Sequence, residues 1–583
     1  MKLPYLNEIS VSREFIDVFR GYNHNLRIGD GEFYDMKNLT SDKYPLLASR
    51  RLRGMCDTLT SPNGIIAKDS LCYVDGPDFF VGAQKYELGL NNKKKTLVSM
   101  GAYVLIFPDK KYVNTKTHDY GNIGEATMTV ECSLCDSNGD EGSYYVSDSD
   151  PTFADDFTNV SVWIDTSTSP YTAKRKSGVQ WVDTISYIKI SASGIDKYFS
   201  PNNTIDKTGL VSETVTITSD VVKAVGNGYI IVPGTMGEGV ETATLTIRKD
   251  IPSMDFVVES GNRLWGCRYG TQIESTPSGS QVTTINEIYA SKLGNFHVWD
   301  SYQGISTDSY AASVGSDGPF TGAITYLGRP IFFKEKCMHV VYGNYPANYQ
   351  IETTECRGVA GTSAKSLAIV NGVLYYKSEA GVCAYDGSSP VEISSVFGDK
   401  LYSNAAAGAL GNKYYISMYN YEDEGYSLFV YDTVKGIWHK EDDTQAVDFA
   451  AWGGDLFFID YADKQIKSVL GSSISVMHYM VPEEKVKWMA ETGIIGIDSP
   501  DKKYISRLDV RLSIEFGGEV RFWAQYDSAD EWEYICTIKG AGLKTFAAPI
   551  RPKRCDHLRL RIEGEGDVKI FSICKTREEG SDA

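Results

Sequence analysis

The chain has 583 residues and a formal net charge of −18, with 58 Lys and Arg against 76 Asp and Glu. At roughly 100–200 residues per domain, this length predicts several domains with a sizeable core. The charged fraction of 23% and the hydrophobic fraction of 42% are ordinary globular values, which exclude a mainly disordered chain. The acidic excess also disfavours a nucleic-acid clamp, because phosphate binding needs Lys and Arg.

Glycine and tyrosine are abundant, at 54 and 38 residues, and this mix favours β-strands joined by tight turns. The longest apolar runs have the length of a strand, as at residues 102–108, so we expect no membrane-spanning segment. The N-terminus lacks the apolar run of a signal peptide, and the eleven cysteines are odd in number and scattered. We therefore expect a protein made in a reducing cytoplasm, with few or no disulfides.

Residues 1–54 are polar and rich in turn-forming residues, and they end in a basic run at residues 49–53. This composition predicts an extended N-terminal arm with short strands and little core of its own. We expect the rest of the chain to fold without it.

From residue 55 to residue 120, short apolar runs alternate with Gly, Asp and Asn turns in two groups. The same rhythm resumes over residues 251–474, in five groups that begin roughly 40–50 residues apart. Each group has the length of one four-stranded propeller blade. The pattern predicts seven blades, or six if the terminal groups merge.

Residues 121–250 interrupt this rhythm with strongly alternating runs rich in Thr, Ser and Asp, which predict an inserted β-sandwich or barrel-like domain. Residues 475–583 alternate almost perfectly and predict a C-terminal antiparallel β-sandwich. The expected fold is all-β: a six- or seven-bladed β-propeller with these two additional β-domains.

The weak candidate for a metal site is a calcium loop formed by Asp136, Asn138 and Asp140. The segment departs from the EF-hand pattern, because Glu141 stands where that loop needs Gly and Ser147 where it needs Glu. The alternative is a polar hairpin turn between two strands.

Other chemistry has little support in the sequence. Cys132 and Cys135 have CxxC spacing, but there is no second pair to complete a zinc site. The seven histidines occur singly, and we expect His297 and His339 to be packed or surface residues. No phosphate-binding loop is present. We therefore predict no catalytic, cofactor-binding or metal-binding residues, and no cofactor.

A propeller glycosidase remains an alternative, because paired carboxylates would suffice for that reaction. The sialidase-type Asp-box is represented only by a fragment at residues 316–319.

Six tyrosines gather in one expected blade, and aromatic residues both pack between sheets and concentrate at protein interfaces. Sequence alone does not separate these two roles. The six tyrosines are Tyr414, Tyr415, Tyr419, Tyr421, Tyr426 and Tyr431.

Residues 374–394, with the run Tyr385-Asp386-Gly387, and residues 431–438 resemble blades of virion proteins of tailed bacteriophages. Residues 28–39, followed by Tyr44-Pro45 and by the basic residues 50–53, resemble the leader that precedes the propeller in tail nozzle and hub proteins of short-tailed phages. Residues 549–562 and 566–572 are similar to the terminal module of prophage structural proteins.

The resemblance implies a non-enzymatic tail nozzle or hub that forms a homo-oligomeric, typically hexameric ring in the DNA ejection conduit. It implies the portal, the adaptor and other tail proteins as partners, with genomic DNA passing without specific binding. The protein would assemble in the host cytoplasm and reside in the virion tail. The alternatives are a host-surface glycan-binding adsorption protein and, less favoured, a glycosidase or depolymerase.

Overall fold

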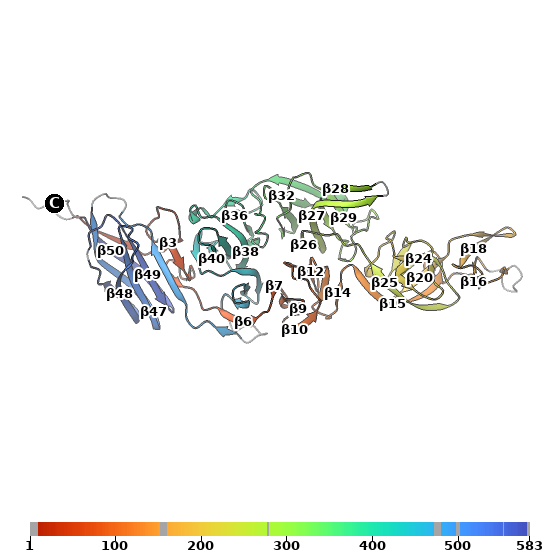
Figure 1. Ribbon diagram of the computed structural model, residues 1–583, viewed down its shortest axis with the longest axis horizontal. Coiled ribbons are helices and arrows are strands. Elements are labelled where there is room, and N and C mark those ends of the chain that lie inside the picture. The colour runs from red at the N-terminus through yellow and green to blue at the C-terminus, as the bar shows by residue number, and fades with distance from the viewer. Residues whose placement is uncertain are drawn as a thin grey trace, which may run out of the picture. The chain divides into compact units, whose positions relative to one another are not determined.

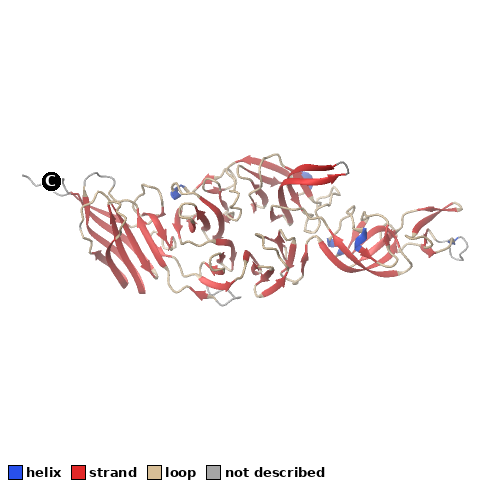
Figure 2. Ribbon diagram, in the orientation of Figure 1, coloured by secondary structure: helices blue, strands red, loops and turns tan. Residues whose placement is uncertain are grey.

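The computed structural model describes residues 10–151, 160–276, 279–471, 480–496, 502–551 and 553–579, although not the side chains of residues 272–281 and 541. These residues form an all-β fold, as expected (Figure 2). Its described helices are short 3₁₀ turns, and no helix in the described ranges is long and apolar enough to cross a membrane. The turns are η3 (Ile195–Lys197), η4 (Lys207–Gly209), η5 (Pro346–Asn348) and η6 (Ser395–Phe397).

The chain divides into two compact units. Unit 1 contains Met1–Lys94, Phe333–Met338 and Thr354–Ala583, and unit 2 contains Lys95–Phe332 and His339–Thr353.

Unit 1 contains four antiparallel sheets in which consecutive strands pair with one another, which we call meander sheets. In three neighbouring pairs of these sheets, the first strands contact each other: β34 with β38, β38 with β42, and β42 with β7. The sheets are β7 (Pro62–Lys68), β8 (Ser70–Asp75), β9 (Asp78–Val81), β10 (Gln84–Glu87); β34 (Ala368–Val370), β35 (Val373–Lys377), β36 (Val382–Tyr385), β37 (Val391–Glu392); β38 (Tyr402–Leu410), β39 (Lys413–Asn420), β40 (Gly425–Asp432), β41 (Ile437–Lys440); and β42 (Ala446–Trp452), β43 (Asp455–Asp460), β44 (Gln465–Ser468) with β6 (Gly54–Thr58) and β45 (Val481–Pro482).

Three further meander sheets belong mainly to unit 2, and Figure 1 labels β12, β26 and β32 in them. There β26 contacts both β11 and β30. The segment Phe333–Met338 of the third sheet falls in unit 1. The sheets are β11 (Thr96–Met100), β12 (Tyr103–Phe107), β13 (Lys111–Asn114), β14 (Tyr120–Asn122); β26 (Phe256–Ser260), β27 (Arg263–Thr276), β28 (Gly279–Ala290), β29 (Tyr310–Ser313); and β30 (Gly322–Tyr326), β31 (Arg329–Phe333), β32 (Cys337–Tyr342), β33 (Gln350–Glu355).

Between β14 and β26 the chain forms two other sheets, one of seven strands and one of four. The larger sheet encloses its own hydrophobic cluster, which includes Ile188, Ile190 and Leu245. Its strands are β15 (Glu125–Cys135), β20 (Tyr187–Ser191), β21 (Leu210–Val211), β22 (Thr216–Ile217), β23 (Ala224–Gly226), β24 (Tyr229–Thr235) and β25 (Val240–Arg248); the smaller sheet has β16 (Tyr144–Ser147), β17 (Val162–Asp165), β18 (Thr172–Ser177) and β19 (Gln180–Asp183).

A ten-stranded sheet in unit 1 combines both ends of the described chain. Alternate residues of β47 are buried, among them Leu508, Val510 and Leu512, as the period of two in the sequence requires. The strands are β1 (Ser10–Ile16), β2 (Gly21–Tyr22), β3 (Glu32–Lys37), β4 (Leu39–Thr40), β5 (Leu47–Ser49), β46 (Lys487–Thr492), β47 (Lys503–Tyr526), β48 (Glu533–Ala548), β49 (Leu558–Glu565) and β50 (Val568–Glu579).

Residues 10–54 are therefore different from the arm with little core that the composition of residues 1–54 predicts. We call residues 10–54 the leader. Its strand β1 pairs with β50 along seven residues, and β3 pairs with β46. The C-terminal sheet is likewise not made from residues 475–583 alone. Turn-rich composition does not exclude a core segment when distant strands supply the missing partners.

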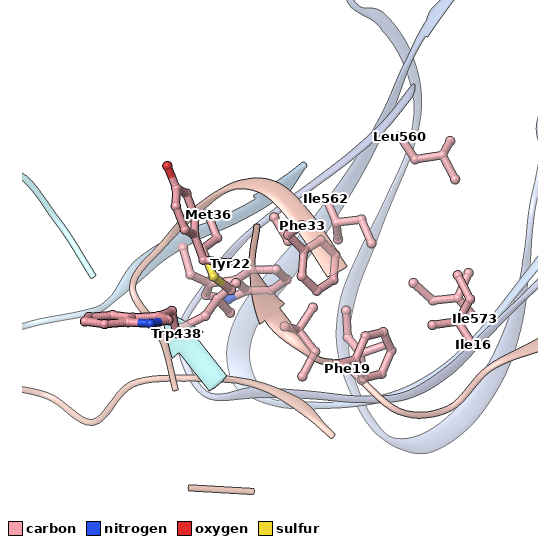
Figure 3. Close-up of a cluster of buried hydrophobic side chains, with 14 of the residues drawn as sticks. Ile16, Phe19, Tyr22, Phe33, Met36, Trp438, Leu560, Ile562 and Ile573 are labelled. Atoms are coloured by element: carbon pink, nitrogen blue, oxygen red, sulfur yellow. The ribbon is translucent and has the colours of Figure 1, made fainter. Parts of the chain in front are cut away.

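Leader side chains form part of the largest hydrophobic cluster of unit 1 (Figure 3). Phe19 stacks on Phe33 at 6.1 Å between ring centroids, and Tyr22 meets Phe429 edge-on at 5.3 Å. Met36 is fully buried. The leader thus joins the core of the ten-stranded sheet to that of the β38–β41 sheet.

The backbone at position 31 requires glycine. Its φ is +86°, and a Cβ atom there would overlap the carbonyl oxygen of Val18. Its own carbonyl oxygen accepts a hydrogen bond from the Arg20 amide at 2.7 Å. The Gly-Asp-Gly-Glu run of the leader therefore includes a position that only glycine fits without strain.

Two arginines of the basic run, Arg50 and Arg53, are buried in ion pairs. Arg53 contacts Glu441 and Asp442, each at 2.6 Å. Arg50 forms a bidentate pair with Glu483, at 2.8 and 3.1 Å. Because removal of either side would leave a buried charge without its partner, these pairs fix where the leader lies.

The residues that follow Arg53 complete the last meander sheet. β6 pairs antiparallel with β44, from Gly54 opposite Ser468 to Thr58 opposite Gln465. A strand from the start of the chain thereby lies fourth in a five-stranded sheet, after β42, β43 and β44 from residues 446–468 and before the short edge strand β45.

We predict that Phe33→Ala lowers the free energy of unfolding by about 3–5 kcal/mol, because it leaves a cavity in the shared core. Leu26→Ala is the matched control, since Leu26 is 84% exposed, and should change stability by less than about 0.5 kcal/mol. Urea denaturation of the full chain measures both. Equal, small effects would mean that the leader does not belong to the core.

A second prediction concerns Asp442. Burial, the largest single effect, would raise its pKa, but the Arg53 guanidinium, the hydrogen bonds from Thr444 and the charge of Arg50 together outweigh burial, and the pKa falls to about 2. The resulting stabilisation, of about 2 kcal/mol, is present above the ordinary pKa of 3.8 and is lost as the pH falls toward 2.

Asp442→Asn should therefore lower the free energy of unfolding by about 3 kcal/mol at neutral pH, and the difference in this free energy between variant and wild type should become smaller in acid. Denaturation curves at several pH values measure this difference. Asp443→Asn is the control, because the Asp443 side chain is 67% exposed. A difference that does not change with pH, or that is equally large in the control, would contradict the role given to the Arg53 pair.

Candidate functional site

The calcium-loop candidate forms a turn between β15 and β16, which belong to different sheets, so it is not the hairpin of the alternative interpretation. One oxygen of Asp136 accepts hydrogen bonds from the amides of Asn138 and Asp140, at 2.7 and 3.0 Å. These bonds lower the pKa of Asp136. The carboxylate thus stabilises the turn. In the described ranges, no group of three or more His, Cys, Asp or Glu residues is placed to hold a metal ion.

The two cysteines of the CxxC spacing are buried thiols outside any disulfide, and most of the other nine cysteines are buried as well. Burial raises the pKa of Cys132 to about 12 and that of Cys135 to about 11. Both therefore stay protonated near neutral pH, and a protonated thiol is a poor nucleophile and metal ligand.

His339 is buried and bridges two hydroxyl groups. Its Nε2 lies 2.8 Å from the Ser316 hydroxyl and its Nδ1 lies 2.9 Å from the Thr353 hydroxyl. A catalytic triad has a carboxylate in the position that Thr353 occupies here. The contact holds the segment that carries the Asp-box fragment against its own sheet. His478 lies outside the described residues.

The six tyrosines of the β38–β41 sheet divide into two groups. Tyr414 and Tyr415 are buried in the core. Tyr419 meets Tyr421 at 5.5 Å and Tyr426 at 5.4 Å, and Tyr421 is 58% exposed. Tyr431 packs against Tyr375 and Trp438 and belongs with the buried pair. The packing role is thus confirmed for part of the cluster, and the interface role of the exposed part stays a prediction.

Unit 2 contains a recess of about 430 Å³ that combines aromatic and titratable side chains. Its walls come from the β11–β14 sheet, from the segment around η3 and from the loop before β29. We call it the tyrosine pocket. Its lining residues are Tyr103, Tyr112, His118, Asp119, Tyr120, Met128, Ser193, Gly194, Lys197, Tyr198 and His297.

The aromatic wall of the pocket is made of rings that hold one another in place. Tyr103 meets Tyr112 edge-on at 5.8 Å, and Phe296 packs behind Tyr103 at 4.9 Å. Gly121 lies beside Tyr112, where a Cβ atom would come within 3.2 Å of the tyrosine hydroxyl. The absence of a side chain at this position keeps the Tyr112 ring uncovered on that side.

The buried floor of the pocket is formed by His297 and Tyr198. Nδ1 of His297 lies 2.7 Å from the carbonyl oxygen of Ile123, so it carries the proton and donates. Tyr198 packs at 4.3 Å on the imidazole and shares a hydrogen bond with the Tyr112 hydroxyl. Burial lowers the pKa of His297 to about 4. The ring is therefore neutral at physiological pH, with Nε2 as a hydrogen-bond acceptor.

The rim of the pocket is polar and exposed. Thr117 donates to the Asp119 carboxylate at 2.6 Å, and the Asp119 carbonyl oxygen accepts from the amide of Asn114 at 2.7 Å. On the other side, the carbonyl oxygen of Lys197 accepts from the side chain of Asn295 at 2.7 Å. The rim is thus tied to both neighbouring segments, and it carries one acidic and one basic side chain.

Sequence reasoning missed this pocket, because its residues come from three segments that each look ordinary. His297 was expected to be a packed or surface residue, and it is packed, although at the floor of a recess. The sequence feature that could have pointed to the pocket is the high density of aromatic and polar residues at positions 112–120, which corresponds to no known motif.

No protein-family model matches the chain, and no curated protein matches it. Solved structures give distant similarities. An exo-β-1,3-galactanase from Phanerochaete chrysosporium aligns with 6% identity over 55% of this chain and 94% of that one, with a TM-score of 0.19. PorZ, a surface component of the type-IX secretion system of Porphyromonas gingivalis, aligns with 10% identity over 90% of this chain and 82% of that one, with a TM-score of 0.25. TM-scores this low assign neither a fold nor an activity.

We predict that the His297 imidazole stays neutral down to about pH 5 in the folded protein. Since its pKa is lowered, protonation opposes folding, and the contribution of this residue to stability is lost as the pH falls from 6.5 toward 4. Imidazole nitrogen shifts in NMR spectra, assigned by comparison with His297→Gln, measure this. The urea-unfolded chain, in which the residue should titrate near 6.5, is the reference. A folded-state midpoint near 6.5 would contradict the buried position.

Proposed function

We propose that the seven meander sheets are the blades of one seven-bladed β-propeller. Contacts within each unit support this proposal. There the first strands of consecutive sheets contact one another, as the inner strands of propeller blades do. β6 would then close the ring by adding a leader strand to the blade of β42, β43 and β44. The alternative count of six blades would require two of these sheets to merge.

The function that we propose is that of a structural component of a bacteriophage tail, a nozzle or hub, without enzymatic activity. The observation that carries it is the burial of the leader, because the segment that resembles the leader of nozzle and hub proteins is built into the core and is held by the Arg50 and Arg53 ion pairs. If the chain is a nozzle or hub protein, its leader should be part of the folded structure, and the buried leader fits that expectation.

In this proposal the chain forms a homo-oligomeric ring, typically a hexamer, in the DNA ejection conduit of the virion tail. Its partners are the portal, the adaptor and other tail proteins, and assembly takes place in the host cytoplasm. The net charge of −18 suits a conduit through which DNA passes without specific binding, because acidic walls repel phosphate. The adsorption protein and the depolymerase stay as alternative predictions.

Sedimentation velocity of the purified full chain, with electron microscopy of the same sample, tests this proposal. We expect a species of about six times the 64.5 kDa protomer mass with a central opening. A protein that stays monomeric at all concentrations would contradict the ring. Release of reducing sugars from a host polysaccharide by that monomer would favour the depolymerase instead.

A further inference from the structure

We propose that the tyrosine pocket is a binding site for one pyranose unit of a saccharide. Its volume of about 430 Å³ falls within the roughly 300–1,000 Å³ of small-molecule sites. The proposal concerns unit 2 alone, so it stands or falls separately from the proposed ring.

The aromatic side chains supply the first requirement of such a site. A pyranose has faces of apolar C–H groups and an edge of hydroxyl groups, so its binding sites combine an aromatic surface with surrounding polar groups. Tyr103 and Tyr112 form a fixed wall, and Tyr120 presents a ring that is 55% exposed at the rim. An exposed ring on an ordered strand offers stacking area with little loss of conformational entropy.

The polar groups supply the second requirement. A sugar hydroxyl both donates and accepts hydrogen bonds, so a site for it needs both kinds of partner. The Asp119 carboxylate accepts, the Lys197 ammonium donates, and the tyrosine hydroxyls do either.

His297 points to a ligand independently of the rim. The residue is buried, with 5% of its surface exposed. Nδ1 is committed to Ile123, and no described residue hydrogen-bonds Nε2. Nε2 is not among the fully enclosed atoms that lack a partner, so it is open to the pocket, and a donor that enters the pocket would hydrogen-bond it.

The charge of the lining disfavours a nucleic acid as the ligand. Single-stranded nucleic acids also stack on aromatic rings, but their binding sites add a positively charged groove for the backbone. Lys197 is the only lysine or arginine among the lining residues, and it lies with Asp119 in the same rim.

Saturation-transfer NMR on the full chain tests the proposal with three probes: the methyl β-glycosides of glucose, galactose and N-acetylglucosamine. We expect at least one probe to receive saturation at its ring protons, with a millimolar Kd. Tyr120→Ala should weaken that binding at least about tenfold, because it removes the stacking ring. Asp119→Asn should also weaken it, while the unfolding midpoint of both variants stays near that of wild type.

Tyr421→Ala is the matched control, since Tyr421 is exposed to a similar extent, 58%, and lies in unit 1. It should leave glycoside binding unchanged. The proposal is overturned if no glycoside binds the wild-type protein, or if the control loses as much binding as Tyr120→Ala. It is also overturned if adenosine monophosphate binds in a Tyr120-dependent way and the glycosides do not.

Discussion

The burial of two arginines against three carboxylates is the constraint on which the arrangement of unit 1 depends. Arg50 and Arg53 each give up hydration, and only close carboxylate partners offset that cost. The partners, Glu441, Asp442 and Glu483, come from residues about 390 to 430 positions further along the chain. In this location of the leader both guanidinium groups have carboxylate partners. The ion pairs therefore select the register in which the apolar leader residues enter the core and in which β6 reaches β44.

Much of the fold could be predicted from the sequence, because its strands are short, alternate cleanly and are separated by Gly, Asn and Asp turns. The all-β class and the approximate extent of the repeated groups follow from that pattern. The leader could not be predicted in the same way. Phe19, Tyr22, Phe33 and Met36 do not repeat with a period of two over a long run, and their partners are distant in sequence. Burial that depends on long-range partners leaves little trace in local composition.

The candidate site was less predictable still. Asp136, Asn138 and Asp140 attracted attention because carboxylates at alternate positions are typical of calcium loops, but Asp136 is used by its own turn. The tyrosine pocket depends on the approach of the β11–β14 sheet to the loop that carries His297, about 180 residues later. A single histidine in a sequence does not reveal whether its second nitrogen faces protein or a recess. Only the fold determines that.

The pairing of β6 with β44 has a consequence for synthesis. The leader leaves the ribosome first, but the carboxylates of Glu441 and Asp442 follow 388 and 389 residues later. At about 5–20 residues per second, the nascent chain spends roughly 20–80 s with two arginines and several aromatic side chains lacking their native partners. Unit 1 cannot reach its final structure while its C-terminal strands are still being made. Its folding therefore waits until β50 has been synthesised, and until then the leader side chains lack their native partners.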